Sequence, residues 1–468
     1  MKPSAPASAT TTSGLKPALL YAVLALAGGA TLAVIVPPLQ APDEWMHFAR
    51  AYQVADGGLL PRRNREGQAG GVLPSSVEAS LRAASTTLWH REAKIKQFGS
   101  QFTEFEIPLD PSHTSFSTFP KTAVEPPFAY LPQALGIRVA RMVSGTVVGA
   151  LMGARLGNLL LVVAVIAWAI YMTPIFRWVL AFMALSPLSL SVAGTATSYG
   201  FTYAVIFLFL AIFLRVAYRP TPPISWRTIA GLVLATLALG LVIPGYFPLV
   251  LLYLLIPAAR LGSRKRYWLN FAVLVVIALG CGAAWVLVVG RPHTPESLLT
   301  MLTRQLLEHP REFGETLLRA IGPPLPFLAK TFGGPLVTDA LNIGHLLAIG
   351  YAILMFLIAL LDVAPNAGRI SLAQRVIPLA AAVLGVLTVS LGMYLTWPPT
   401  YFDQGIHPRQ VIPLACVALL FFLNAMPRVG GFGRFAREHL GWIAALYFVL
   451  RMAETLWAVY QRFYDLSS

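Results

Sequence analysis

Charged side chains are scarce in this 468-residue chain, and their scarcity excludes an ordinary soluble domain. Asp, Glu, Lys and Arg make up 12% of the residues, whereas about 25% is typical of soluble proteins. Hydrophobic residues make up 56% of the chain, and its mean hydropathy is +0.67. This composition predicts an integral membrane protein that crosses the bilayer many times.

Cysteine is nearly absent as well, and so are familiar catalytic motifs. Cys281 and Cys416 both lie inside apolar runs, which argues against a disulfide framework and against a thiolate metal site. The sequence contains no Walker A loop, no H-E-x-x-H motif and no G-x-S-x-G motif. If the protein is an enzyme, its driving force must therefore arrive with a preactivated substrate.

Long apolar runs, in contrast, are abundant. A transmembrane helix needs about 20 mostly apolar residues, so the expected fold is an all-α integral membrane protein with about 11 transmembrane helices. Segment 177–194 contains Pro187 and segment 246–260 is short, so these two are the weakest candidates. The candidate segments are 16–36, 154–172, 177–194, 200–217, 228–244, 246–260, 268–290, 342–361, 376–396, 411–426 and 440–460.

The net charge of +15 is distributed in a way that predicts the orientation. With the N-terminus in the cytoplasm, Arg and Lys dominate every cytoplasmic turn, as the positive-inside rule requires. The charge therefore needs no nucleic-acid partner to explain it. The chain then divides into a disordered cytoplasmic N-terminus (1–15), a first transmembrane helix (16–36), an extracytoplasmic loop with the candidate catalytic acids (37–145), transmembrane helices (146–290), an extracytoplasmic loop with amphipathic helices (291–341) and C-terminal transmembrane helices (342–468) that include a short extracytoplasmic loop (397–410).

The first polar cluster, PPLQAPDEWMHF (37–48), follows the first span directly. In a helix that starts near Pro42, Asp43, His47 and Arg50 lie on one face, and such a helix would lie along the membrane surface. Acids in a first helical turn complement the helix dipole. A carboxylate at a membrane boundary can instead act as a general base or help to hold a divalent cation such as Mg²⁺ or Mn²⁺. The local pattern leaves these roles open.

Two further clusters fall outside the membrane in this topology. EPPFAYLPQALGIRVAR (125–141) predicts an interfacial helix, which is either a simple belt of aromatic and arginine side chains or a shelf beside which a lipid chain lies. WPPTYFDQGIHPRQVIPL (397–414) places Arg409 where a span begins, and a guanidinium there can grip phosphate oxygens. Arg155, at the outer end of the second span, is a weaker candidate.

Together, the three clusters resemble domain-of-unknown-function family 2142, a family of bacterial polytopic membrane proteins that looks like the type C glycosyltransferase superfamily. The family pattern is roughly P-x-Q-x-P-D-E-x-x-H-F near the first span, then P-P-x-x-Y-L-P-Q, then Q-G-R-Y-x-x-P near the C-terminal spans. Here these segments read PPLQAPDEWMHF, EPPFAYLPQALG and DQGIHPRQVIPL, within a resemblance that runs from about residue 34 to about residue 425. In the third segment, Ile-His-Pro separates Gln404-Gly405 from Arg409, and Gln410 replaces the usual Tyr.

The resemblance implies a type C fold and an enzyme that uses a polyprenyl-phosphate-linked sugar on the outer face of the bacterial inner membrane. The acceptor would be an envelope glycan or lipid, beside the membrane lipids themselves. Asp43 would be the base, and Glu44 its partner or the alternative base; the two acids would hold a Mg²⁺ or Mn²⁺ ion if one is used. The remaining roles would fall to Arg409, Gln404, His407 and Arg155 at the donor phosphate, and to Gln40, His47, Arg50 and Tyr130 along the acceptor or the phosphate.

Other functions fit the same composition. A lipid-linked glycan flippase or another transporter would place charge inside the spans, near the midplane, whereas here the polar clusters gather at one face. A glycan polymerase or ligase would move whole glycans from the same kind of lipid carrier. A non-catalytic scaffold would use Asp43 only to cap a helix, which is a role that Asn fills well.

Overall fold

The computed structural model describes residues 12–87, 94–103, 105–219, 224–289, 345–362, 370–396, 407–424 and 438–465, with short pieces at 307–308, 310–311, 314–315 and 435. Most of the predicted disordered N-terminus (1–15), of the second loop (291–341) and of the short loop (397–410) lies outside these residues. Gln404 is among the residues outside them.

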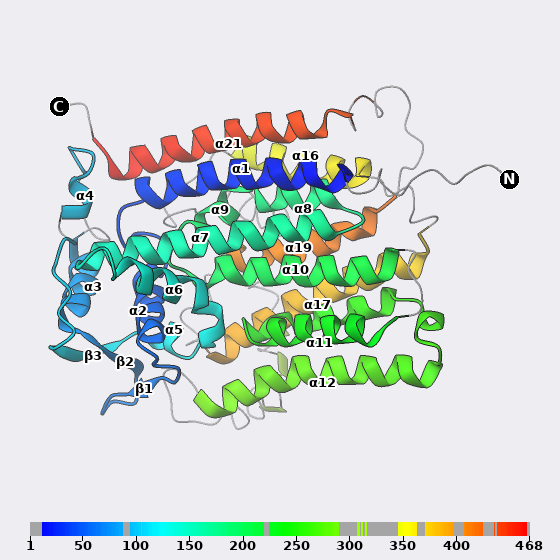
Figure 1. Ribbon diagram of the computed structural model, residues 1–468, viewed down its shortest axis with the longest axis horizontal. Helices are drawn as coiled ribbons and strands as arrows, with labels where there is room; N and C mark the ends of the chain where they lie inside the picture. The colour runs from blue at the N-terminus through cyan, green and yellow to red at the C-terminus, as the bar shows by residue number, and fades with distance from the viewer. Residues whose placement is uncertain are drawn as a thin grey trace.

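Within the described residues, six helices are long and apolar enough to cross a membrane. Shorter apolar segments accompany them, and the axes run broadly side by side in Figure 1. The long helices are α1 (Thr12–Ile35), α7 (Val147–Met172), α10 (Ser198–Tyr218), α12 (Arg264–Val289), α17 (Leu372–Thr396) and α21 (Leu440–Phe463). The shorter segments are α11 (Trp226–Gly240), η3 (Pro244–Leu255), η4 (Ala258–Leu261), α16 (His345–Leu361), α19 (Pro408–Ala418) and η7 (Leu419–Phe422).

The predicted span 177–194 is not one helix. It forms α8 (Arg177–Ala184) and α9 (Pro187–Ala193), and all of α9 is buried. Proline lacks an N–H group, so Pro187 begins a helix without losing a bond but cannot continue α8. The Ser186 hydroxyl caps the new helix by accepting a hydrogen bond from the N–H of Ser189 at 3.2 Å. The segment predicted at 246–260 is 3₁₀-helical in η3 and η4. The expected count of about 11 spanning helices is therefore not confirmed.

The described residues of the first loop form a cap at one end of the bundle, which we define as residues 37–87, 94–103 and 105–146. The N-terminus of α1 lies at the other end (Figure 1). The cap contains a three-stranded antiparallel sheet in the order β1-β2-β3, which the all-α prediction lacked. Gly70 pairs with Thr118 in its register, and Pro74 pairs with Thr114. Its elements are α2 (Glu44–Ala55), β1 (Arg62–Arg63), β2 (Ala69–Pro74), α3 (Ser75–Thr87), α4 (Ser100–Thr103), β3 (Thr114–Thr118), α5 (Pro120–Ala123), η2 (Pro127–Tyr130) and α6 (Leu131–Ala140).

Glycines fix the cap onto the bundle through α6 and α7. A Cβ atom added at Gly136 would lie 2.0 Å from the carbonyl oxygen of Gly153 and 3.1 Å from Cα of Gly157, so the two backbones touch. Such close approach requires residues without side chains. The other face of α6 carries exposed apolar side chains, with Leu135 57% and Val139 63% exposed.

The helix α2 corrects one prediction. It was expected to lie along the membrane surface, but all of its residues except Trp45 are buried. The cap covers both faces, because β2, α5 and α6 all pack on α2. The Thr122 hydroxyl in α5 also donates a hydrogen bond of 2.7 Å to the carbonyl of Met46. Asp43 and His47 therefore belong to an enclosed site.

Candidate functional site

Asp43 and Arg409 meet at the cap end of the bundle, although 366 positions separate them in the sequence. Nη2 of Arg409 lies 2.5 Å from Oδ2 of Asp43, and Nη1 donates a hydrogen bond of 3.1 Å to the carbonyl of Pro42. Nζ of Lys121, in α5, lies 3.8 Å from Oδ1 of the same carboxylate. One carboxylate is thus held between two cations, and the first and third polar clusters form one site.

Aromatic side chains position Arg409 at the start of α19. The Tyr203 hydroxyl donates a hydrogen bond to the carbonyl of Arg409, and the Tyr246 hydroxyl donates one of 2.8 Å to that of Gln410. The guanidinium stacks over Tyr199, 4.8 Å from the ring centroid, which is a favourable cation–π distance. Within the described residues, the buried Nε of Arg409 has no hydrogen-bond partner. The guanidinium therefore keeps one buried donor that no described group satisfies.

The backbone at Asp43 is also unusual. Its φ of 59° lies in the left-handed region, which Asp and Asn adopt more readily than other side chains that carry a Cβ. The turn starts α2 at Glu44, and it leaves the side chain of Asp43 24% exposed. The site is therefore enclosed but still open to a ligand at this carboxylate.

Charge keeps Asp43 ionised. Burial on its own would raise the pKa of Asp43. The charges of Arg409 and Lys121 and the hydrogen bond from Arg409 lower the pKa by more than burial raises it, so it lies well below the usual range. A carboxylate with so low a pKa is a weak base while its cations stay in place. Anything that draws Arg409 and Lys121 away would raise the pKa of Asp43 and make it a stronger base.

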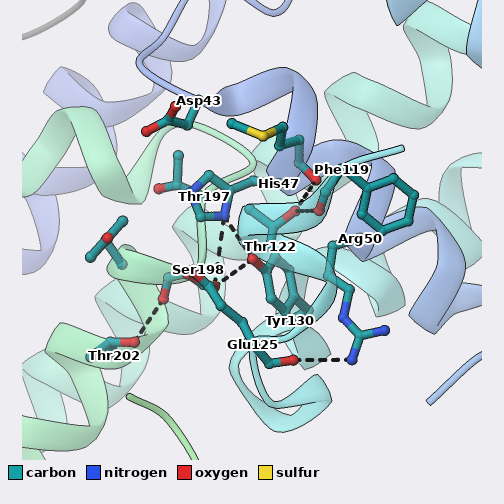
Figure 2. A network of polar contacts seen from close by, with 12 residues as sticks. Asp43, His47, Arg50, Phe119, Thr122, Glu125, Tyr130, Thr197, Ser198 and Thr202 are labelled. Carbon is teal, nitrogen blue, oxygen red and sulfur yellow. Dashed lines mark hydrogen bonds and ion pairs between the residues drawn. The ribbon is translucent and has the colours of Figure 1, made fainter. Parts of the chain in front are cut away.

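A second network lies beside Asp43, Lys121 and Arg409, which we call the ion cluster. Tyr130 donates a hydrogen bond of 2.6 Å to Oε2 of Glu125, and the Ser198 hydroxyl donates one of 2.8 Å to the same oxygen. Nδ1 of His47 lies 2.7 Å from the Tyr130 hydroxyl. Figure 2 shows His47 between Asp43 and the Tyr130–Glu125 pair. The network thus joins the first cluster to the second cluster and to the start of α10.

Burial controls the protonation of this network. It lowers the pKa of His47 to about 3, and the positive charges of Arg409 and Lys121 lower it too, so His47 is neutral at pH 7. Burial raises the pKa of Glu125, although the hydrogen bonds from Tyr130 and Ser198 oppose this. The side chain of Glu125 is 21% exposed, whereas that of His47 is 2% exposed.

Glu44 is paired elsewhere, in spite of its position next to Asp43. Nε and Nη2 of Arg155 donate hydrogen bonds of 2.8 and 2.6 Å to its two oxygens, and the N–H of Ala196 donates one of 3.0 Å. The side chains of Glu44 and Arg155 are both 0% exposed. Arg155 also binds the carbonyls of Ala33 and Val36 at 2.7 and 2.8 Å. This geometry argues against the predicted roles of Glu44 as a base and Arg155 as a phosphate ligand, and it favours a structural role.

The other predicted site residues differ in their contacts and burial. Arg50 is fully buried and donates hydrogen bonds to Gln53 at 2.6 Å and to the carbonyl of Glu125 at 3.0 Å, so it holds the backbone of the second cluster and does not line a cavity. Gln40 is 1% exposed, and its amide nitrogen has no partner within the described residues. His407 precedes α19, and burial together with Arg409 lowers its pKa to about 4.

Sequence reasoning missed Lys121 and Tyr199 and did not single out Glu125. Glu125 opens the motif EPPFAY, and Lys121 comes four positions before it. Tyr199 lies at the start of a span, where the polar and aromatic pair Ser198-Tyr199 indicates that this end of the helix borders a polar region. None of these signals identifies a partner, because each contact comes from tertiary packing.

The described donors around Asp43 are not those that a divalent cation prefers. Within the described residues, no group of three or more His, Cys, Asp or Glu side chains lies close enough to hold one. Ca²⁺ and Mg²⁺ take oxygen ligands, several of them carboxylates, whereas Asp43 is a single carboxylate that faces two cations. Glu44, the other predicted ligand, is held by Arg155.

Comparison with known protein families identifies the family of this chain. A family model described as "Predicted membrane protein (DUF2142)" matches residues 26–418. The chain belongs to this family. The match spans both Asp43 and Arg409, so the ion cluster lies within the part of the chain that the DUF2142 family shares. Comparisons with curated proteins and with solved structures give no match.

Proposed function

We propose that this DUF2142 protein is a glycosyltransferase that moves a sugar from a polyprenyl-phosphate donor to an envelope glycan or lipid. The single observation that carries the proposal is the carboxylate of Asp43 between Arg409 and Lys121, at the end of a bundle of apolar helices. Such a site can meet a lipid-borne donor and a water-borne acceptor at once. We place the cap on the extracytoplasmic face of the bacterial inner membrane, as the charge distribution predicts.

The two cations fit the leaving group. Glycosyl transfer from a lipid phosphate releases an anion, whose developing charge needs fixed positive groups. Arg409 offers a planar fork of donors, of which Nε has no partner in the described part of the chain. Lys121 offers a point charge on the other side of Asp43. One carboxylate between two cations leaves an excess of one positive charge, which a phosphodiester carrying one negative charge would balance.

Donor binding would then activate the base. A phosphate that takes over Arg409 and Lys121 removes the two groups that lower the pKa of Asp43. The freed carboxylate takes the proton of the acceptor hydroxyl as the acceptor oxygen bonds to the anomeric carbon. The bond from that carbon to the phosphate oxygen breaks in the same step, and the polyprenyl phosphate leaves with the electron pair. A single displacement of this kind inverts the anomeric configuration.

A transporter is the second candidate, and one contact favours it. Within α21, Arg451 is 1% exposed and forms an ion pair with Glu454. Charged residues inside a span often mark transport pathways, and sequence analysis did not single this pair out. The ion cluster under the cap still favours chemistry at the membrane surface over passage through the membrane.

The test compares transfer by the purified protein and by two carboxamide variants. A radiolabelled polyprenyl-phosphate sugar serves as donor and cell-envelope glycan as acceptor. Asp43→Asn should abolish transfer. Asp56→Asn is the matched control, because Asp56 forms a 2.5 Å ion pair with Arg141 at the other end of α2. Equal transfer by both variants and the wild type would remove Asp43 as the base. Lipid movement in vesicles without any transfer would favour the transporter.

A further inference from the structure

The hydrogen bonds around Tyr130 fix the proton positions in their network. An ionised carboxylate only accepts hydrogen bonds, so the hydroxyl proton of Tyr130 lies on the 2.6 Å bond to Glu125. The Tyr130 oxygen must then accept the 2.7 Å bond from His47. Because His47 is neutral, its proton sits on Nδ1, and Nε2 carries a free lone pair.

That lone pair lies on the side of the ion cluster. Asp43 and His47 are one helical turn apart, and the N–H of His47 donates a 3.1 Å hydrogen bond to the carbonyl of Asp43. Figure 2 shows the ring of His47 with one edge toward Tyr130 and the other toward the side of Asp43. Within the described part of the chain, His47 has one side-chain hydrogen bond, through Nδ1. Among the residues that the structure describes, this buried imidazole thus holds an acceptor with no partner.

We propose that His47, Tyr130 and Glu125 form a proton relay that carries the acceptor's proton away from Asp43 and ends on Glu125. This inference rests on the proposed function, because the proton comes from the transfer step. It assigns a reaction role to Glu125, for which the sequence alone gave none. It also explains why a buried histidine points its protonated nitrogen at a tyrosine and not at the neighbouring acid.

The relay balances atom by atom. Asp43, protonated by the acceptor hydroxyl, passes its proton through one bridging water to Nε2 of His47. The Nδ1 proton of His47 moves to the Tyr130 oxygen while the Tyr130 hydroxyl proton moves to Oε2 of Glu125. Asp43 is again a carboxylate, Tyr130 is again a phenol, and Glu125 is a neutral acid. Glu125 then releases its proton to water, and His47 regains the Nδ1–H form by exchange with water.

The surroundings suit this direction of transfer. Glu125 lies at the more exposed end of the chain of hydrogen bonds, and burial raises the affinity of its carboxylate for a proton. Ser198 keeps the carboxylate in place with its own hydrogen bond. The charged and titratable groups that face Glu125 are His47, Arg50, Tyr130, Tyr199 and Arg409. Those that face His47 are Asp43, Lys121, Glu125, Tyr130, Tyr199 and Arg409.

Two isosteric variants separate a relay from a structural network. Glu125→Gln keeps an oxygen that accepts from Tyr130 but cannot take a proton, and Tyr130→Phe removes the hydroxyl. Each should lower turnover by roughly 100-fold or more, as loss of acid–base help does, while the affinity for the donor lipid changes less than about twofold. Tyr52→Phe is the matched control, because Tyr52 is a buried tyrosine of α2 whose hydroxyl has no partner within the described residues.

The pH profile gives the readout that a structural role would not move. Glu125 must be ionised to accept a proton, so wild-type turnover should fall as the pH drops through its raised pKa. Glu125→Gln should remove that acid limb, whereas a purely structural network would leave it in place. If both variants turned over as fast as the wild type and kept its pH profile, the relay would be overturned but the proposed function would stand.

A second measurement needs no activity. Nitrogen-15 spectra of labelled histidine, with the His47 signal assigned from a His47→Gln variant, report the tautomer directly. The relay requires the neutral Nδ1–H form at pH 7 in the wild type and loss of that preference in Tyr130→Phe. A wild-type signal from the Nε2–H form, or from the charged ring, would overturn the relay whether or not the protein transfers sugar. Absence of transfer would overturn the proposed function, and the relay with it, because the proton that the relay carries comes from the transfer step.

Discussion

Asp43→Asn should bind the donor lipid more tightly than the wild type while failing to use it. In the ligand-free protein, Asp43 occupies the two cations that the phosphate needs, at 2.5 Å from Arg409 and 3.8 Å from Lys121. The phosphate must therefore displace an internal competitor. Asparagine keeps the shape of the side chain and adopts the left-handed backbone readily, so the variant removes the charge and little else.

The size of the effect follows from the contacts. A hydrogen bond to a charged group contributes about 1.5–3 kcal/mol net, and the longer contact with Lys121 adds little because its lysine is partly solvated. The amide oxygen of Asn still accepts a hydrogen bond from Arg409, which keeps part of the competition. A gain of about 1–2 kcal/mol corresponds to roughly 5–30-fold tighter binding.

The assay is a binding titration of a labelled short-chain polyprenyl phosphate to purified protein in nanodiscs. Asp43→Asn should lower the dissociation constant, and Asp56→Asn should leave it unchanged, since Asp56 pairs with Arg141 outside the ion cluster. Weaker or equal binding by Asp43→Asn would refute the idea that carboxylate and phosphate compete for Arg409. Absence of binding by the wild type would reject the donor itself.

Further variants test the remaining parts of the argument. Arg409→Lys should weaken donor binding by about tenfold with little change in melting temperature, because it removes the bidentate fork and keeps the charge; a loss of folding instead would make Arg409 structural. Glu44→Gln leaves Arg155 buried without its partner and should destabilise the protein by about 3–5 kcal/mol, which thermal unfolding in detergent would detect. Gly136→Ala should loosen the cap, since its Cβ would meet backbone 2.0 Å away, whereas Gly145→Ala meets nothing within 4 Å and should be neutral; limited proteolysis of the cap compares them.

The sequence predicted the bundle because hydrophobic length is a local property. The six long helices lie where unbroken apolar runs lie, and the break at Pro187 was visible as a weak candidate. The cap could not be predicted in the same way. Its strand β1 has two residues, Arg62 and Arg63, and β2 pairs with β3 across 40 to 48 positions. Pairing at such a distance depends on packing that no local pattern encodes.

The site was predicted only in part, because some of its residues carry a local pattern and others do not. Asp43 and Arg409 stood out because both were polar residues at span ends on the same predicted face. Helical periodicity put His47 on the face of Asp43, but it could not show that Tyr130 would cover Nδ1. Lys121 was missed because a lone lysine in a long polar loop has no distinguishing pattern. Its meaning comes from the 3.8 Å contact with Asp43.

The two adjacent acids have different roles, because the backbone turn at Asp43 directs their side chains to different surroundings. Asp43 precedes the helix with φ of 59°, and its carboxylate, itself 24% exposed, faces two cations. Glu44, the first residue of α2, faces the opposite way into the bundle, where Arg155 and the N–H of Ala196 satisfy its two oxygens. A buried, fully paired acid has no capacity left for a substrate, whereas a carboxylate held by exchangeable cations does. The fold therefore fixes the position of Asp43 through its neighbour, and Asp43 remains the acid whose partners a phosphate can take.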